Sequence, residues 1–84
     1  MRGRPAARID LRERFKVARG EPVGVMQERA KDEALAFLDL SKCPTRLRIE
    51  VASQASGDVV HGVLRLLGYS VQRPDRSTLI VYDD

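Results

Sequence analysis

The chain has 84 residues, a hydrophobic content of 43%, a charged content of 32% and a formal net charge of +3 at pH 7. A chain of this length forms one domain with a thin core, which leaves little room for a deep substrate cavity. The single cysteine excludes an internal disulfide, and no apolar stretch approaches the roughly 20 residues of a membrane span, so the composition predicts a cytoplasmic protein with neither a secretion signal nor a membrane segment.

The positive charge is concentrated in the first twenty residues. This segment carries seven basic and two acidic side chains, a net charge of +5, whereas residues 21–84 carry eight basic and ten acidic side chains, a net charge of −2. Twelve of the fifteen basic residues are arginine, which forms bidentate contacts to phosphates and carboxylates. Either a phosphate-bearing partner or a GC-rich genome accounts for this enrichment.

The N-terminal segment divides into an arm and a first strand. Residues 1–7 show no apolar periodicity and are interpreted as a mobile basic arm, followed by a single α/β domain over residues 8–84. Residues 8–17 alternate between apolar and charged side chains, with one exception at Glu13, and this period of two predicts a strand. A short helix lined by Leu11, Phe15 and Ala18 is the alternative.

Two helices are predicted from apolar spacing. The first covers residues 22–39, where Pro22 suits the first helical turn and apolar side chains recur at helical spacing. The second covers residues 59–67 and is apolar almost all round, which indicates burial. Residues 56–58 offer caps for its start, and Gly68 closes it.

Three further strands complete the predicted elements. Residues 46–51 alternate without fault and predict a strand. Residues 69–71 and 78–82 predict two more, which the turn-forming residues 74–77 join into a hairpin.

The order β-α-β-α-β-β predicts an α+β fold, a two-layer α/β sandwich with two helices on one face of a four-stranded sheet. The alternative is a winged helix-turn-helix, with a helix over 45–55, a recognition helix over 57–68 and a wing over 69–83. The alternation at 46–51 has the period of a strand and favours the sandwich.

Three stretches resemble the small TusA-like (SirA-like) sulfur-carrier family. Ile9-Asp10-Leu11-Arg12 resembles its opening strand, Glu21-Pro22-Val23 resembles its helix start, and residues 47–71 resemble its second half. The resemblance covers residues 9–82 and implies the same two-layer fold and a sulfur-carrier ancestry. The family's cysteine at the start of the first helix is replaced here by Arg19-Gly20, so the resemblance implies a degenerate carrier.

The sequence offers little catalytic chemistry. With one histidine and one cysteine, a Cys/His metal cluster cannot be built, and there is no glycine-rich phosphate loop. His61 is interpreted as a packing or capping residue on an apolar helix. Cys43 is interpreted as an inert, dispensable thiol, with a persulfide carrier as the alternative. We therefore predict no cofactor, no metal and no enzymatic activity.

Two features favour nucleic acid as a partner. Arg2-Gly3-Arg4-Pro5 resembles the core of an AT-hook, in which an extended arginine-bearing chain lies in the minor groove. The polar sides of the predicted strands also share an open face of the sheet, joined by either Leu79 and Val81 or Ile80 and Tyr82. The basic residues expected on that face are Arg8, Arg12, Arg14, Lys16, Arg46 and Arg48.

The sequence thus predicts a non-catalytic basic binding module that associates with nucleic acid through its arginine-rich N-terminal segment. The residues predicted to bind are Arg2, Arg4, Arg8, Arg12, Arg14, Lys16, Arg19, Arg46 and Arg48. The alternatives are a protein-interaction adaptor or small inhibitor from a mobile element, with an acidic protein or a second copy of the chain as partner, and a degenerate TusA-like carrier.

Overall fold

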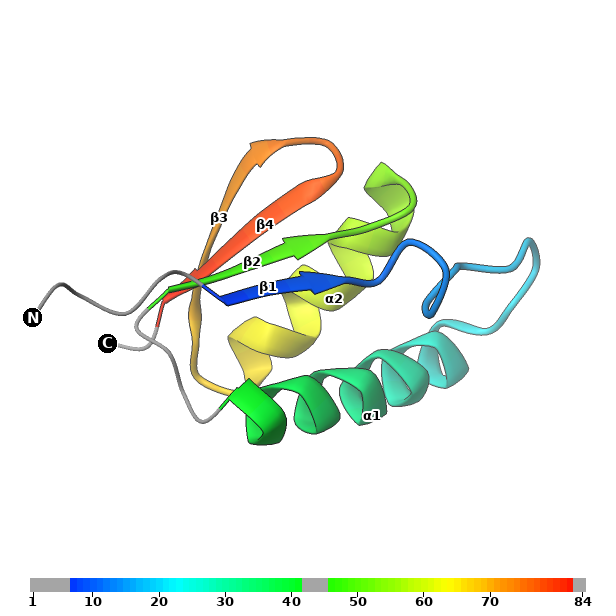
Figure 1. The fold of residues 1–84 in the computed structure, drawn as a ribbon. Helices are drawn as coiled ribbons and strands as arrows, with labels where there is room; N and C mark the ends of the chain where they lie inside the picture. The colour runs from blue at the N-terminus through cyan, green and yellow to red at the C-terminus, as the bar shows by residue number, and fades with distance from the viewer. Residues whose placement is uncertain (1–6, 42–45, 83–84) are drawn as a thin grey trace, which may run out of the picture.

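The computed structural model describes residues 7–41 and 46–82 (Figure 1). Its elements follow in the order β1 (Ala7–Asp10), α1 (Val23–Ser41), β2 (Arg46–Glu50), α2 (Gln54–Leu66), β3 (Ser70–Asp75) and β4 (Thr78–Tyr82). The strands form one mixed sheet in the order β1-β2-β4-β3, in which β1 is parallel to β2 and the other pairs are antiparallel. Both helices cover the same face of this sheet (Figure 1).

This architecture confirms the predicted α+β sandwich and its element order. Residues 46–50 are a strand, so the winged helix-turn-helix alternative is wrong. Along β2 the side chains alternate between exposed and buried, because successive residues of a strand point to opposite faces.

The core lies between the sheet and the helices. It is built from alternate residues of the strands and from the inward stripes of both helices. Its buried members are Leu11, Phe15, Ala30, Ala34, Leu38, Leu47, Ile49, Val51, Val60, Val63, Leu64, Leu79 and Val81.

The first strand is shorter than the sequence pattern predicts. β1 ends at Asp10; the Leu11 amide still donates to the Glu50 carbonyl at 2.8 Å, but the Phe15 amide then donates back to the Leu11 carbonyl at 3.0 Å. The prediction of a strand to residue 17 is therefore wrong beyond Asp10. Leu11 and Phe15 are both fully buried, and a continued strand would place Glu13 on the same buried face; in the turn the Glu13 side chain is exposed instead.

The second helix begins earlier than predicted. Its N-cap is Ser53, whose hydroxyl accepts the Ser56 amide at 3.2 Å, so the cap expected at residues 56–58 is wrong. Ser56 and Gly57 are buried instead, because the first turn of α2 packs against the sheet. Gly68, with φ of 95°, follows the helix as predicted.

The C-terminal hairpin forms as predicted, with a longer first strand. β3 continues to Asp75, and Pro74 is tolerated because β3 lies at the edge of the sheet, where a missing N–H breaks no ladder hydrogen bond. The Ser77 amide donates to the Asp75 carboxylate at 2.9 Å across the turn, which lowers the pKa of Asp75.

Candidate nucleic-acid interface

The sheet face opposite the helices is the open face, and its side chains follow from the strand register. One row across the sheet is Arg8, Arg48, Ile80 and Gln72, and the next is Arg46, Tyr82 and Ser70. Ile80 and Tyr82 lie on this face because Leu79 and Val81 are buried in the core. The structure thereby decides which pair of β4 side chains accompanies the arginines.

Arg46 and Tyr82 form a stacked pair at one end of the open face. The guanidinium carbon of Arg46 lies 5.3 Å from the centroid of the Tyr82 ring, and its Nη2 atom donates to the Tyr82 hydroxyl at 3.3 Å. That hydroxyl donates in turn to Gln72 Oε1 at 3.1 Å. The pair is held by hydrogen bonds and by the attraction of a cation to the face of an aromatic ring.

Glu50 is surrounded by three arginines at the other end of the open face. Its carboxylate lies 2.7 Å from Arg8, 3.6 Å from Arg48 and 3.8 Å from Arg12. The hydrogen bond from Arg8 lowers the pKa of Glu50, and the other two arginines act in the same direction. Glu50 therefore offsets part of the positive charge that the sequence places here.

Asp10 binds Arg12 on the same face. The guanidinium donates to both carboxylate oxygens, at 3.0 and 2.8 Å, and this contact lowers the pKa of Asp10 to about 2. Counted over the described residues, the open face holds four arginines and three carboxylates, an excess of one positive charge. These are Arg8, Arg12, Arg46 and Arg48 against Asp10, Glu50 and Asp75.

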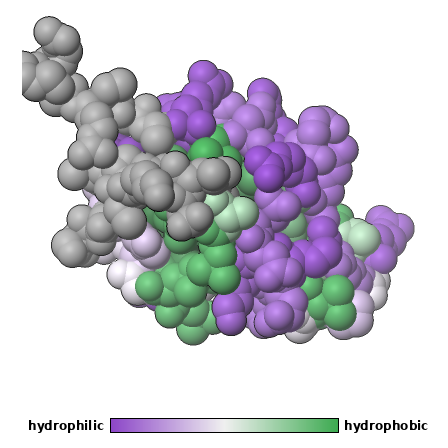
Figure 2. Space-filling model, turned by 60° about the horizontal axis from the view of Figure 1, so that its bottom comes forward, coloured by the Kyte–Doolittle hydropathy of each residue, from purple (hydrophilic) through white to green (hydrophobic). Residues whose placement is uncertain are grey.

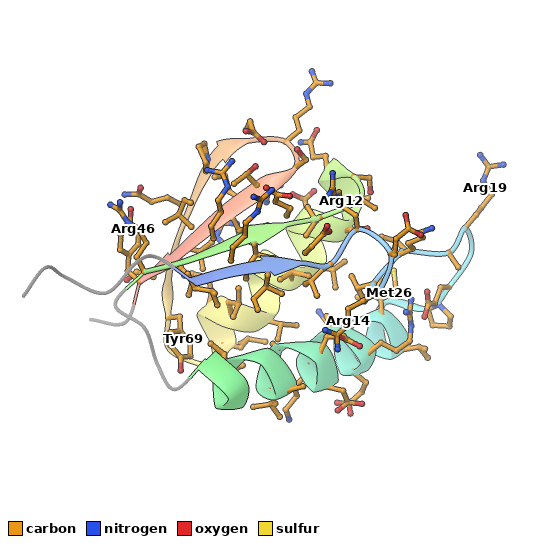
Figure 3. All side chains as sticks on the ribbon, in the orientation of Figure 1. Arg12, Arg14, Arg19, Met26, Arg46 and Tyr69 are labelled. Atoms are coloured by element: carbon orange, nitrogen blue, oxygen red, sulfur yellow. The ribbon has the colours of Figure 1, made fainter. Side chains whose placement is uncertain are left out.

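The structure does not bring all the predicted basic residues to this face. Arg14 lies on the side of the helices, 3.4 Å from Glu33 of α1, and Lys16 pairs with Glu13 in the loop after β1. The expectation that Arg14 and Lys16 share the open face is wrong, because β1 ends before them. Figure 3 shows Arg12 above the sheet, Arg14 below it, and Arg19 pointing away from the body of the molecule.

Other predicted residues have no described position. Arg2 and Arg4 of the predicted arm lie outside the residues that the structure describes, and so does Cys43.

Arg29 of α1 holds the loop between β1 and α1 in place, a role that the sequence analysis did not predict. Its guanidinium donates to both carboxylate oxygens of Glu21, at 2.8 and 2.6 Å, and to the Lys16 carbonyl at 2.8 Å. It also lies 5.0 Å from the centroid of the Phe15 ring, and its hydrogen bond lowers the pKa of Glu21. No periodicity signals this contact, because its partners precede the helix.

A second cluster joins β3 to α2 on the helix side of the sheet. Arg73 donates to Asp58 at 3.0 Å and lies 3.4 Å from His61 Nδ1. Burial and then the charge of Arg73 lower the pKa of His61. A side chain at Gly57 would meet the Arg73 guanidinium at 2.8 Å, so this glycine allows Arg73 to lie against the helix. The cluster ties the edge strand to the helical layer.

Within residues 7–41 and 46–82, no group of three or more His, Cys, Asp or Glu side chains is placed to hold a metal ion. No helix in the same described part of the chain is both long and apolar enough to cross a membrane.

We expect the protein to lose stability in acid. The pKa values of Asp10, Glu21, Glu50 and Asp75 are all lowered in the fold. A lowered carboxylate pKa contributes stability above the unfolded value, here 3.8 or 4.5, and this contribution disappears as the pH falls toward about 2. The pKa of His61 is also lowered, so its contribution to stability is lost in the same direction, as the pH falls below 6.5.

Urea denaturation at steps from neutral pH down to about pH 2 measures this loss of stability. Asp10→Asn is the matched variant, and it should show a shallower decline because one shifted carboxylate is gone. A free energy of unfolding that stays constant from pH 4.5 to 2 would contradict the assignment.

Comparison of the chain with protein-family models, curated proteins and solved structures found no match. The resemblance to TusA-like carriers therefore stays a prediction.

Proposed function

We propose that this protein is a non-catalytic nucleic-acid-binding module that uses its arginine-rich N-terminal segment together with the open face of its sheet. The observation that carries the proposal is the convergence of Arg8, Arg46 and Arg48, from two neighbouring strands, on one face that the helices leave uncovered. Arginines spaced over an exposed sheet suit a phosphate backbone.

The sheet register supports joint action of the N-terminal segment and the open face. The chain enters β1 at Ala7, which pairs with Leu47 beside Arg46. The segment that carries Arg2 and Arg4 therefore joins the sheet at the Arg46 end. Arg46 forms no ion pair with a carboxylate among the described residues, and its positive charge is not offset there.

The ion pairs around Glu50 are compatible with phosphate binding. The side chains of Arg8 and Arg48 are 64% and 49% exposed, whereas that of Glu50 is only 13% exposed, so a phosphate can reach the two guanidinium groups from solvent while they still contact Glu50. A guanidinium group has five N–H donors, so each arginine can bind a phosphate and keep its contact with Glu50. The local excess of positive charge then favours the nucleic acid.

A titration against short single-stranded RNA and short duplex DNA at several salt concentrations tests the proposal. We expect affinity to fall steeply as salt rises, because arginines that neutralise phosphates release counterions. The double variant Arg46→Gln/Arg48→Gln should weaken binding, whereas Lys31→Gln/Arg65→Gln, which removes two exposed positive charges from the helices, is the matched control. Absence of salt-dependent binding to either nucleic acid would reject the proposal.

A second candidate function, self-association, rests on the helical layer. Figure 2 shows apolar side chains gathered on this side of the molecule. A groove of about 280 Å³ lies between the helices, and Leu66 in its wall is 82% exposed. The residues that line it are Gln27, Glu28, Lys31, Val63, Leu66 and Leu67.

Sedimentation over a range of concentrations tests this candidate. An exposed leucine next to an apolar-sided groove suits an isologous contact with a second copy, in which each Leu66 enters the other groove. We expect Leu66→Asp to abolish concentration-dependent association without loss of the fold. A wild-type protein that remains monomeric would remove this candidate.

A further inference from the structure

The open face is divided into strips of different chemistry. β4 lies between β2 and β3 in the sheet and carries the half-buried side chains Ile80 and Tyr82. Arg46 and Arg48 of β2 flank this apolar strip on one side, and Gln72 of β3 flanks it on the other. Cations, an apolar and aromatic strip, and an amide group thus follow one another across the face.

We infer that the nucleic acid bound here is single-stranded and that one of its bases stacks on the Arg46–Tyr82 pair; this inference rests on the proposed function. Stacking requires a base whose planar face is accessible, and single strands bind to aromatic rings and guanidinium planes in this way. In a duplex the planar faces of the bases are covered by their neighbours, and a flat sheet cannot enter a groove to reach them.

The strips match the parts of a nucleotide. Phosphates lie along the arginines of β2, the base covers Tyr82 at the end of the inner strand β4, and Gln72 supplies amide N–H donors to the edge of that base. The hydrogen bonds that Tyr82 makes with Arg46 and Gln72 hold the ring in position before the nucleotide arrives. A duplex would use only the arginines.

Tyrosine fluorescence provides a direct readout. The chain has two tyrosines, Tyr69 and Tyr82, and no tryptophan, so the Tyr69→Phe variant reports on Tyr82 alone. We expect short oligouridylate to quench this emission because the base stacks on the ring, and we expect short duplex DNA to leave it unchanged. Quenching by duplex DNA equal to that by oligouridylate would overturn the inference.

Affinity measurements with substituted Tyr82 complete the test. Base–aromatic stacking has a free energy of about 1–3 kcal/mol, so Tyr82→Leu should weaken oligouridylate binding by about 5- to 150-fold. Tyr82→Phe keeps the ring and should retain most of the affinity, and neither variant should change duplex binding. Circular dichroism checks that both variants fold. If either variant does not fold, the quenching experiment on Tyr69→Phe still tests the inference.

The outcomes separate the two proposals. Salt-dependent binding that Tyr82→Leu leaves unchanged, without quenching, overturns the stacking inference and leaves the proposed function standing. No binding to either nucleic acid overturns both.

Discussion

Deletion of residues 1–6 is expected to reduce the salt dependence of nucleic-acid binding by up to about two units of log–log slope. Arg2 and Arg4 are the basic residues of this segment, and it holds no acid. Each phosphate neutralised contributes a slope of about −0.9 for duplex DNA and about −0.7 for a single strand. Parallel titrations of the full-length and truncated proteins at several salt concentrations measure the difference.

The end point of the deletion is set by the structure. Ala7 and Arg8 pair with Leu47 and Arg48, so a deletion through residue 8 would cut into β1 and confuse lost charge with lost fold. The double variant Arg2→Gln/Arg4→Gln is the matched control, because it removes the same charge and keeps the chain length. Equal slopes for the full-length and truncated proteins would show that the segment makes no phosphate contacts.

Replacement of Phe15 by alanine is expected to have the largest effect on stability, a loss of about 3–5 kcal/mol in the free energy of unfolding. Among the side chains that the structure describes, Phe15 is the largest fully buried one, and it fixes the loop after β1 against the core. A chain of this length has a total stability of about 4–13 kcal/mol, so the loss is a large fraction of the whole. Urea denaturation of the two proteins measures the loss.

Phe15→Leu is the conservative control. It keeps most of the buried volume, leaves a smaller cavity and should cost clearly less than Phe15→Ala. If Phe15→Ala unfolds at the same urea concentration as the wild type, Phe15 is not part of the core and does not anchor residues 11–22 to it.

The sequence by itself determined the element order and the layers. The alternation at residues 46–51 and the helical spacing from Val23 predict β2 and α1 correctly, because a buried face imposes its period on the chain. The hairpin was also predictable, since the residues around Asp75 favour a turn locally. In each of these cases the determining interactions lie close together along the chain.

Only the tertiary structure decided how far β1 extends, where α2 begins and how the charges are partnered. The alternation over residues 8–17 predicts a strand, but a strand would bury Glu13 together with Leu11 and Phe15, and the turn after Leu11 exposes Glu13 while both apolar side chains stay in the core. The charge count could not show that Glu50 would lie among three arginines or that Arg46 would stack on Tyr82. Those partners are far apart in sequence, and strand pairing, which depends on the whole sheet, brings them together.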